Sequence, residues 1–76
     1  MTIDANRQWD VKVGDRTLRQ GDKLVDHTGR NLVFVRISEP PSLTRSGKLR
    51  VRDGAGDVYE VHPREIDGTM VWKPAQ

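Results

Sequence analysis

Apolar and polar residues alternate with a period of two along much of this chain. Trp9, Val11 and Val13 alternate with Asp10 and Lys12, and no segment of helical length repeats apolar residues at the i, i+3, i+4 spacing. Such alternation is typical of strands that bury one face, because successive side chains of a strand point to opposite sides. The pattern therefore predicts an all-β fold.

Short turn signals divide the first half of the chain into strands. Gly14-Asp15, Gly21-Asp22 and the sequence HTGR at 27–30 contain the residues that turns favour. The second of these signals leads into Leu24 and Val25, which begin another apolar stretch. We therefore expect several short strands joined by tight turns.

The sequence NLVFVRI at 31–37 is the most apolar piece of the chain. A single phase along this strand would bury Val33, Val35 and Ile37 together on the core side. If this strand pairs with residues 48–52 in the sheet, Phe34 and Arg36 point outward and join the outer face of that sheet.

The segment SEPPSLTRSG at 38–47 predicts a surface loop. Pro40 and Pro41 lack the amide hydrogens that a central strand needs, and they fix an extended conformation. A long loop therefore separates the apolar strand from the stretch that follows.

The end of the chain predicts a single turn of helix and a last strand. In HPREI at 62–66, Pro63 suits the first position of a helical or 3₁₀ turn, and Ile66 would then point inward. Asp67-Gly68 is a further turn signal, and TMVW at 69–72 predicts a short closing strand.

The stretch KLRVRDGAGDVYEV at 48–61 predicts a β-hairpin, and the length of its loop decides which side chains share a face. A loop of two or four residues would place Leu49 on the same face as Glu60 and would mix core with solvent. A three-residue loop, 54–56, avoids this and puts Gly56 at the left-handed position that such a loop needs. The predicted pairs are Leu49 with Val61, Arg50 with Glu60, Val51 with Tyr59, Arg52 with Val58 and Lys48 with His62.

Length and composition limit what this chain can be. Its 76 residues suffice for one small domain, which we place at 9–73, between a flexible N-terminus (1–8) and a tail (74–76). The absence of cysteine excludes disulfides and thiolate metal sites. The longest apolar run, LVFV, is far shorter than the roughly 18 residues of a membrane span, and the polar N-terminus predicts no secretory signal. We expect a cytoplasmic protein with no membrane partner.

Cations gather on the outer side of the predicted sheet and in the adjoining loop. Cations beside an aromatic ring are typical of proteins that bind single-stranded DNA or RNA, because the cations contact phosphates and the ring stacks on a base. The same positions also fit an ordinary solvent-exposed face, since Glu60 would face Arg50, the net charge is only +2, and a loop could cover the ring. The candidate nucleic-acid-binding residues are Phe34, Arg36, Arg45, Lys48, Arg50 and Arg52.

The sequence predicts neither a catalytic nor a metal site. The GxG of GAGDVY at 54–59 is followed by a strand, whereas a nucleotide-binding loop requires a helix there. His27 and His62 lie far apart with no cysteine to complete a metal site, and no nucleophile stands in a catalytic context. We expect no enzyme activity, no metal and no cofactor.

The order of the predicted elements resembles the SH3-like small β-barrels, including the Tudor and KOW groups. The residues that carry the likeness are Gly21-Asp22 before Leu24-Val25, the hairpin 48–61, and the turn 62–66 that leads into the last strand. The likeness covers most of 9–73 and implies about five to six short antiparallel strands with one 3₁₀ or helical turn. The chain lacks the aromatic cage of a methyl-lysine-reading Tudor domain and the acidic, aromatic-rich groove of a peptide-binding SH3 domain.

A second resemblance concerns source. The ending YEVHPREI and the arginine-rich composition are similar to short uncharacterised proteins of actinobacterial phages, which would place this protein in a host cytoplasm. That resemblance implies no biochemical activity.

The sequence predicts a non-enzymatic small binding module that binds DNA or RNA. The alternative is a protein-protein interaction module, in which an exposed sheet edge or an apolar patch around Phe34 or Trp72 docks a host or phage protein or a second copy. A third hypothesis is a small structural component of a larger assembly. Trp9 and Trp72 are predicted to be core plugs of the barrel.

Overall fold

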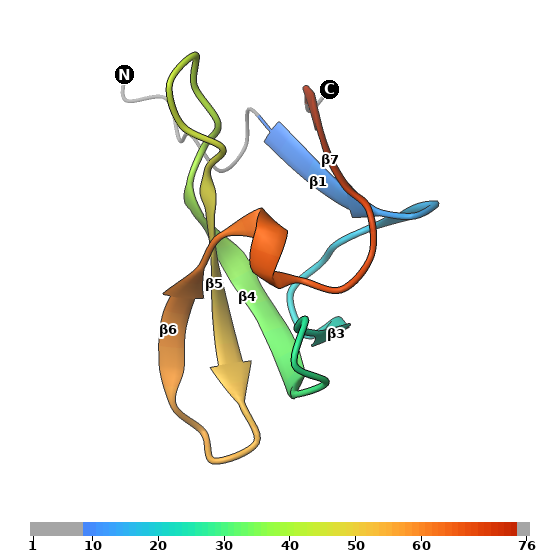
Figure 1. Ribbon diagram of the computed structural model, residues 1–76, viewed down its shortest axis with the longest axis vertical. Coiled ribbons are helices and arrows are strands. Elements are labelled where there is room, and N and C mark those ends of the chain that lie inside the picture. The colour runs from blue at the N-terminus through green and yellow to red at the C-terminus, as the bar shows by residue number, and fades with distance from the viewer. Residues whose placement is uncertain (1–8, 75–76) are drawn as a thin grey trace.

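Strands make up most of the computed structural model, which describes residues 9–74 (Figure 1). In chain order the elements are β1 (Trp9–Val13), β2 (Arg16–Thr17), β3 (Lys23–Val25), β4 (Asn31–Glu39), β5 (Lys48–Asp53), β6 (Val58–Val61), the 3₁₀ turn η1 (Pro63–Glu65) and β7 (Met70–Pro74). The predicted all-β fold with one 3₁₀ turn is confirmed. The predicted flexible segment 1–8 lies outside the described residues, as do 75–76, while Pro74 of the predicted tail belongs to β7.

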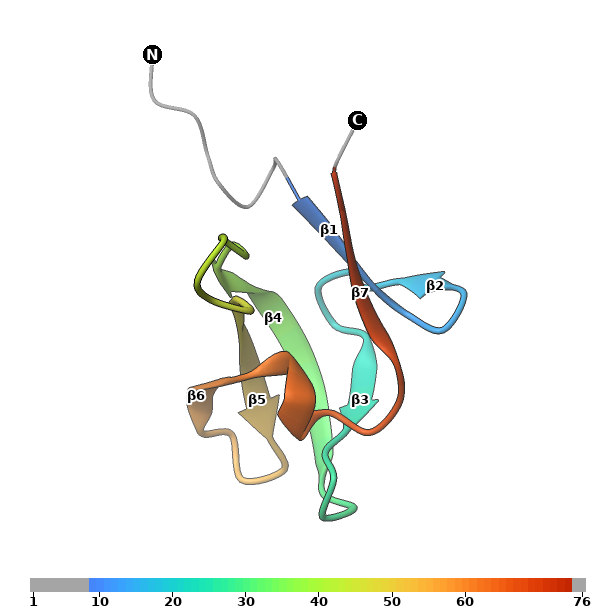
Figure 2. The ribbon, with the colours of Figure 1, turned by 45° about the horizontal axis from the view of Figure 1, so that its top comes forward.

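The strands form two antiparallel sheets, with the orders β2-β1-β7 and β3-β4-β5-β6. Figure 2 shows the smaller sheet standing beside the larger one, with the chain passing from β2 into β3. Backbone hydrogen bonds also join the end of β3 to the segment around η1: Asp67 N–H donates to the Val25 carbonyl at 2.8 Å, and His27 N–H donates to the Glu65 carbonyl at 2.8 Å. The segment that leads from β6 to β7 is therefore held against the end of β3.

Apolar side chains from both sheets form one core. The buried members among the described residues are Val11, Leu18, Leu24, Leu32, Phe34, Ile37, Leu49, Val51, Val61 and Ile66. Leu49 and Val51 have no exposed surface, and Ile66 points inward as predicted. Trp9 and Trp72 are half-buried and meet edge to face with ring centroids 6.4 Å apart, so the predicted plugs lie at the margin of the core.

The predicted β5–β6 hairpin is confirmed in its loop and in four of its five pairs. The predicted pair of Lys48 with His62 is wrong, because β6 ends at Val61. Leu49 faces Val61, and Val51 faces Tyr59. The loop closes with a hydrogen bond of 3.1 Å from the Gly56 N–H to the Asp53 carbonyl, and Gly56 adopts a φ of +90°. Only glycine adopts this conformation at low cost, which explains why the sequence predicted the loop correctly.

The prediction of a single phase along β4 is wrong. Phe34 is 5% exposed and belongs to the core, while Val33 and Val35 are only half-buried. Phe34 faces Val51 in β5, and the next pair is Arg36 with Arg50, so Val35 has no partner and forms a β-bulge. A bulge adds one residue to a strand and so inverts the alternation beyond it.

Trp72 holds the loop between β4 and β5. Its indole Nε1–H donates to the Ser46 carbonyl at 2.8 Å. Gly47 is buried beneath the ring with a φ of +86°, and a Cβ built there would lie 2.6 Å from Trp72 Cζ2 and 3.0 Å from the Glu39 carbonyl oxygen. The loop can approach the smaller sheet this closely only because residue 47 has no side chain.

We predict that Gly47→Ala lowers the free energy of unfolding by about 1–3 kcal/mol, because the added methyl group overpacks the contact with Trp72 and favours another backbone conformation. Urea denaturation measures the change. Gly54→Ala is the matched control: nothing lies within 4 Å of the position that its methyl group would take, so its effect should stay within about 0.5 kcal/mol. Equal stabilities of the two variants would contradict the role given to Gly47.

Candidate nucleic-acid interface

The larger sheet turns one side away from the core, and its cross-strand register arranges the side chains there in rows. One row runs Lys23, Val33, Arg52 and Val58, and the next runs Arg36, Arg50 and Glu60. We call this side the outer face. Its members are Lys23, Val25, Asn31, Val33, Arg36, Glu39, Lys48, Arg50, Arg52, Val58 and Glu60.

Two arginines face each other at the centre of the outer face. Arg36 of β4 lies directly opposite Arg50 of β5, although like charges in this arrangement destabilise a sheet. Glu60 lies opposite Arg50 on the other side, but its carboxylate accepts a hydrogen bond from the Ser38 hydroxyl. Among residues 9–74 the structure shows one side-chain ion pair, Arg45 with Glu39, so no described carboxylate pairs with either central arginine.

The structure brings four of the six predicted binding residues together. Arg36, Arg50 and Arg52 share the outer face, and Lys48 lies at its end, opposite Glu39. Arg45 lies in the loop and its Nη1 donates to Glu39 Oε1 at 3.3 Å, an exposed pair that contributes about 0–1 kcal/mol. Phe34 lies in the core and cannot stack on a base, so the predicted platform is wrong.

A hollow of about 450 Å³ lies at one end of the larger sheet, where β3, β4 and β5 lie side by side, and its lining includes residues of the outer face as well as Leu24 and Leu32 of the core. Val25, which is 39% exposed, and Val33 contribute apolar surface to it. Lys23, Arg52 and the amide of Asn31 add polar groups. We call it the apolar hollow.

The turn between β3 and β4 supports this hollow through Asp26. Its Oδ1 accepts hydrogen bonds from the Thr28 hydroxyl at 2.6 Å and from the backbone N–H groups of Thr28 and Arg30, both at 2.9 Å. The Thr28 hydroxyl, followed by the Arg30 N–H, lowers the pKa of Asp26 below its ordinary value. The charged carboxylate thus organises the turn that leads into Asn31.

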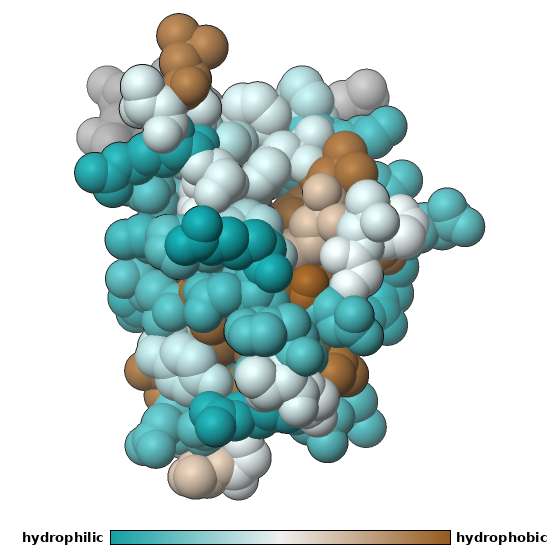
Figure 3. Space-filling model, in the orientation of Figure 1, coloured by the Kyte–Doolittle hydropathy of each residue, from teal (hydrophilic) through white to brown (hydrophobic). Residues whose placement is uncertain are grey.

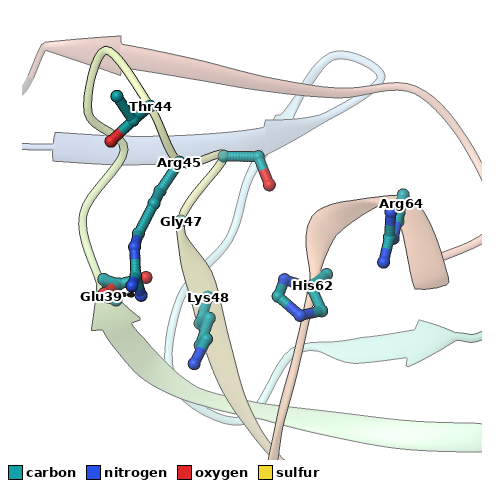
Figure 4. A pocket seen from close by; sticks show the side chains of 8 residues that line it. Glu39, Thr44, Arg45, Gly47, Lys48, His62 and Arg64 are labelled. Atoms are coloured by element: carbon teal, nitrogen blue, oxygen red, sulfur yellow. Dashed lines mark hydrogen bonds and ion pairs between the residues drawn. The ribbon is translucent and has the colours of Figure 1, made fainter.

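A second hollow, of about 300 Å³, lies beyond the other end of β5 (Figure 4). We call it the cationic hollow; its lining residues are Glu39, Thr44, Arg45, Ser46, Gly47, Lys48, His62 and Arg64. It forms where β6 leaves the sheet, because the last pair of the hairpin is Leu49 with Val61 and Lys48 has no strand partner on that side. The backbone N–H of His62 donates to Glu65 Oε2 at 2.6 Å, which fixes the start of η1 beside the hollow.

Exposed apolar side chains are spread over several elements. Leu43 is fully exposed at the tip of the β4–β5 loop, where Figure 3 shows an apolar group projecting from the surface. Trp9, Pro41 and Leu43 line a shallow hollow there. The predicted protein-binding patch around Phe34 is wrong because that ring is buried, and Trp72 is half-buried with its indole nitrogen already bonded.

Sequence reasoning missed part of this surface. Lys23 could have been found, because Leu24 must point inward and its neighbour therefore points out. The sequence prediction placed Val33 on the core side, whereas it lies on the outer face. The signal for a bulge was the change of spacing among the larger apolar residues: Leu32 and Phe34 are two positions apart, and Ile37 follows three positions later. Arg64 had no signal, because its place depends on the path of the chain after β6.

No family model, curated protein or solved structure matches this chain. The likeness to SH3-like barrels and the likeness to phage proteins therefore stay predictions. No helix within residues 9–74 is long and apolar enough to cross a membrane. Over the same range, no three His, Cys, Asp or Glu side chains form a cluster that could hold a metal ion.

We predict that Arg36→Gln raises the free energy of unfolding by about 0.2–1 kcal/mol at low salt, because it removes the like-charge contact with Arg50. The gain should shrink in 1 M salt, where charges are screened within about 3 Å. Thermal or urea unfolding at two salt concentrations measures both effects. Lys73→Gln is the control: Lys73 faces Asp10, so its removal should not stabilise. A loss of stability in Arg36→Gln would show that Arg36 serves the fold.

Proposed function

We propose that this protein binds single-stranded nucleic acid on the outer face of its larger sheet. The observation that carries the proposal is the pair Arg36 and Arg50, which face each other and form no ion pair with a carboxylate of the described residues. A phosphate group seated there would interact with two guanidinium groups and relieve their repulsion. The arrangement costs stability in the free protein and is useful when an anion is bound.

The outer face offers different contacts to the two parts of a nucleotide. Arg36, Arg50 and Arg52 supply charge for phosphates, and Lys48 continues this row along β5. The apolar hollow offers an uncharged surface for a base, with the Asn31 amide able to donate and accept hydrogen bonds. A base reaches such a surface only when it is unpaired, and this favours single strands over duplexes.

The number of cations sets the expected salt dependence. Each phosphate contact contributes a slope of about −0.7 in a plot of log affinity against log salt for single strands, so three to four contacts give about −2 to −3. The small net charge of +2 limits the long-range attraction. Binding should therefore be modest and local to the face.

We predict that a fluorescent single-stranded oligonucleotide binds at low salt with a slope of this size, measured by anisotropy. Arg50→Glu with Arg52→Glu should abolish binding, because both cations become repulsive. The control is Lys12→Glu with Lys73→Glu, which makes the same change in net charge on β1 and β7 of the other sheet. No binding of the wild-type protein at low salt, or equal losses in the two variants, would refute the proposal.

A second prediction concerns the base. An oligonucleotide with abasic sites should bind several-fold more weakly than the normal strand, because the apolar hollow then stays empty. Val25→Asp should remove most of this difference by placing a charge in the hollow. Val58→Asp is the matched control: it adds the same charge to an exposed valine of the outer face outside the hollow. Equal binding of normal and abasic strands would limit the interface to the phosphates.

The protein-binding alternative stays open, and its candidate position moves to Leu43 at the loop tip, the most exposed large apolar residue among those described. The outer face and the loop tip are formed by different residues. A partner that depends on Leu43 and not on Arg50 would therefore favour the alternative.

A further inference from the structure

We propose that the cationic hollow binds a phosphate monoester, the terminal phosphate of the nucleic-acid strand that lies on the outer face. That a nucleic-acid strand lies on the outer face rests on the proposed function, whereas the cationic hollow is a separate site with residues of its own. Arg64 and His62 line it and do not belong to the outer face.

The charge of the hollow matches a terminal phosphate better than an internal one. Arg45, Lys48 and Arg64 contribute three positive charges, and Glu39 removes one through its ion pair with Arg45. The balance of about +2 suits a phosphate monoester, which carries about −1.5 to −2 at pH 7. An internal phosphodiester carries a single negative charge and would leave part of the hollow uncompensated.

The elements around the hollow also favour the end of a chain. Figure 4 shows Lys48, His62 and Arg64 around one space, with Arg45 held toward Glu39. The loop bounds this space on one side, β5 on another and η1 on a third. Hydroxyl groups of Thr44 and Ser46 add hydrogen-bond donors for phosphate oxygens.

The hollow is placed where a strand on the outer face would end. Arg52, Arg50 and Lys48 occupy alternate positions of β5, about 7 Å apart, and Lys48 belongs to both the outer face and the cationic hollow. A backbone that follows these cations from the apolar hollow therefore reaches the cationic hollow next. Lys48 is the residue shared by the two sites, and Arg64 is specific to the second.

Three oligonucleotides of one sequence test this proposal by anisotropy: one with a 5′ phosphate, one with a 3′ phosphate and one with hydroxyl groups at both ends. We expect a terminal phosphate at one end to tighten binding about three- to tenfold. Arg64→Gln should remove this gain. Its effect on the hydroxyl-ended strand should match that of Lys73→Gln, which removes the same charge from β7.

The outcomes separate the two proposals. If all three strands bind equally, the terminal-phosphate site is refuted while the proposed function stands. If none binds at low salt, the proposed function is refuted, and NMR titration with phenyl phosphate and with dimethyl phosphate decides the hollow by itself. Saturable shifts at Lys48, His62 and Arg64 with the monoester alone, lost in Arg64→Gln, support the site. Equal shifts with both compounds, or none, overturn it.

Discussion

A strand that must bury Leu32, Phe34 and Ile37 on one side cannot keep a strict period of two, and β4 meets this constraint with a bulge at Val35. The bulge allows the large side chains on both sides of it to enter one core. It also turns Arg36 outward, opposite Arg50. The packing of the core and the position of the charged pair thus follow from the same unpaired residue.

β5 organises the surface in a similar way. Leu49 and Val51 are its most buried residues, and the residues between and beside them are cations. A strand that is anchored so firmly by its inner face holds the outer side chains on a rigid support, as a binding site requires. The apolar hollow and the cationic hollow lie near the two ends of this strand.

The sequence predicted those parts of the fold in which local chemistry allows one solution. The β5–β6 hairpin followed from its glycines and from the need to keep Leu49 and Glu60 apart, and η1 followed from Pro63. The phase of β4 was predicted wrongly, because LVFV is apolar at both parities and only the larger size of Leu32, Phe34 and Ile37 indicates which residues enter the core. The cationic hollow depends on where the chain goes after β6, which is set by tertiary contacts and not by the local pattern. Four predicted cations lie together on the outer face, whereas the sequence did not indicate that Arg64 lines the cationic hollow.

The indole of Trp72 connects the smaller sheet to the wall of the cationic hollow through its hydrogen bond to the Ser46 carbonyl. An indole nitrogen that gains or loses such a partner changes the energy of its excited state, and the colour and intensity of its emission change with it. Any movement of the loop during ligand entry would reach this ring directly. Trp72 thus offers an optical signal, beside that of Trp9, for changes in a pocket that neither indole lines.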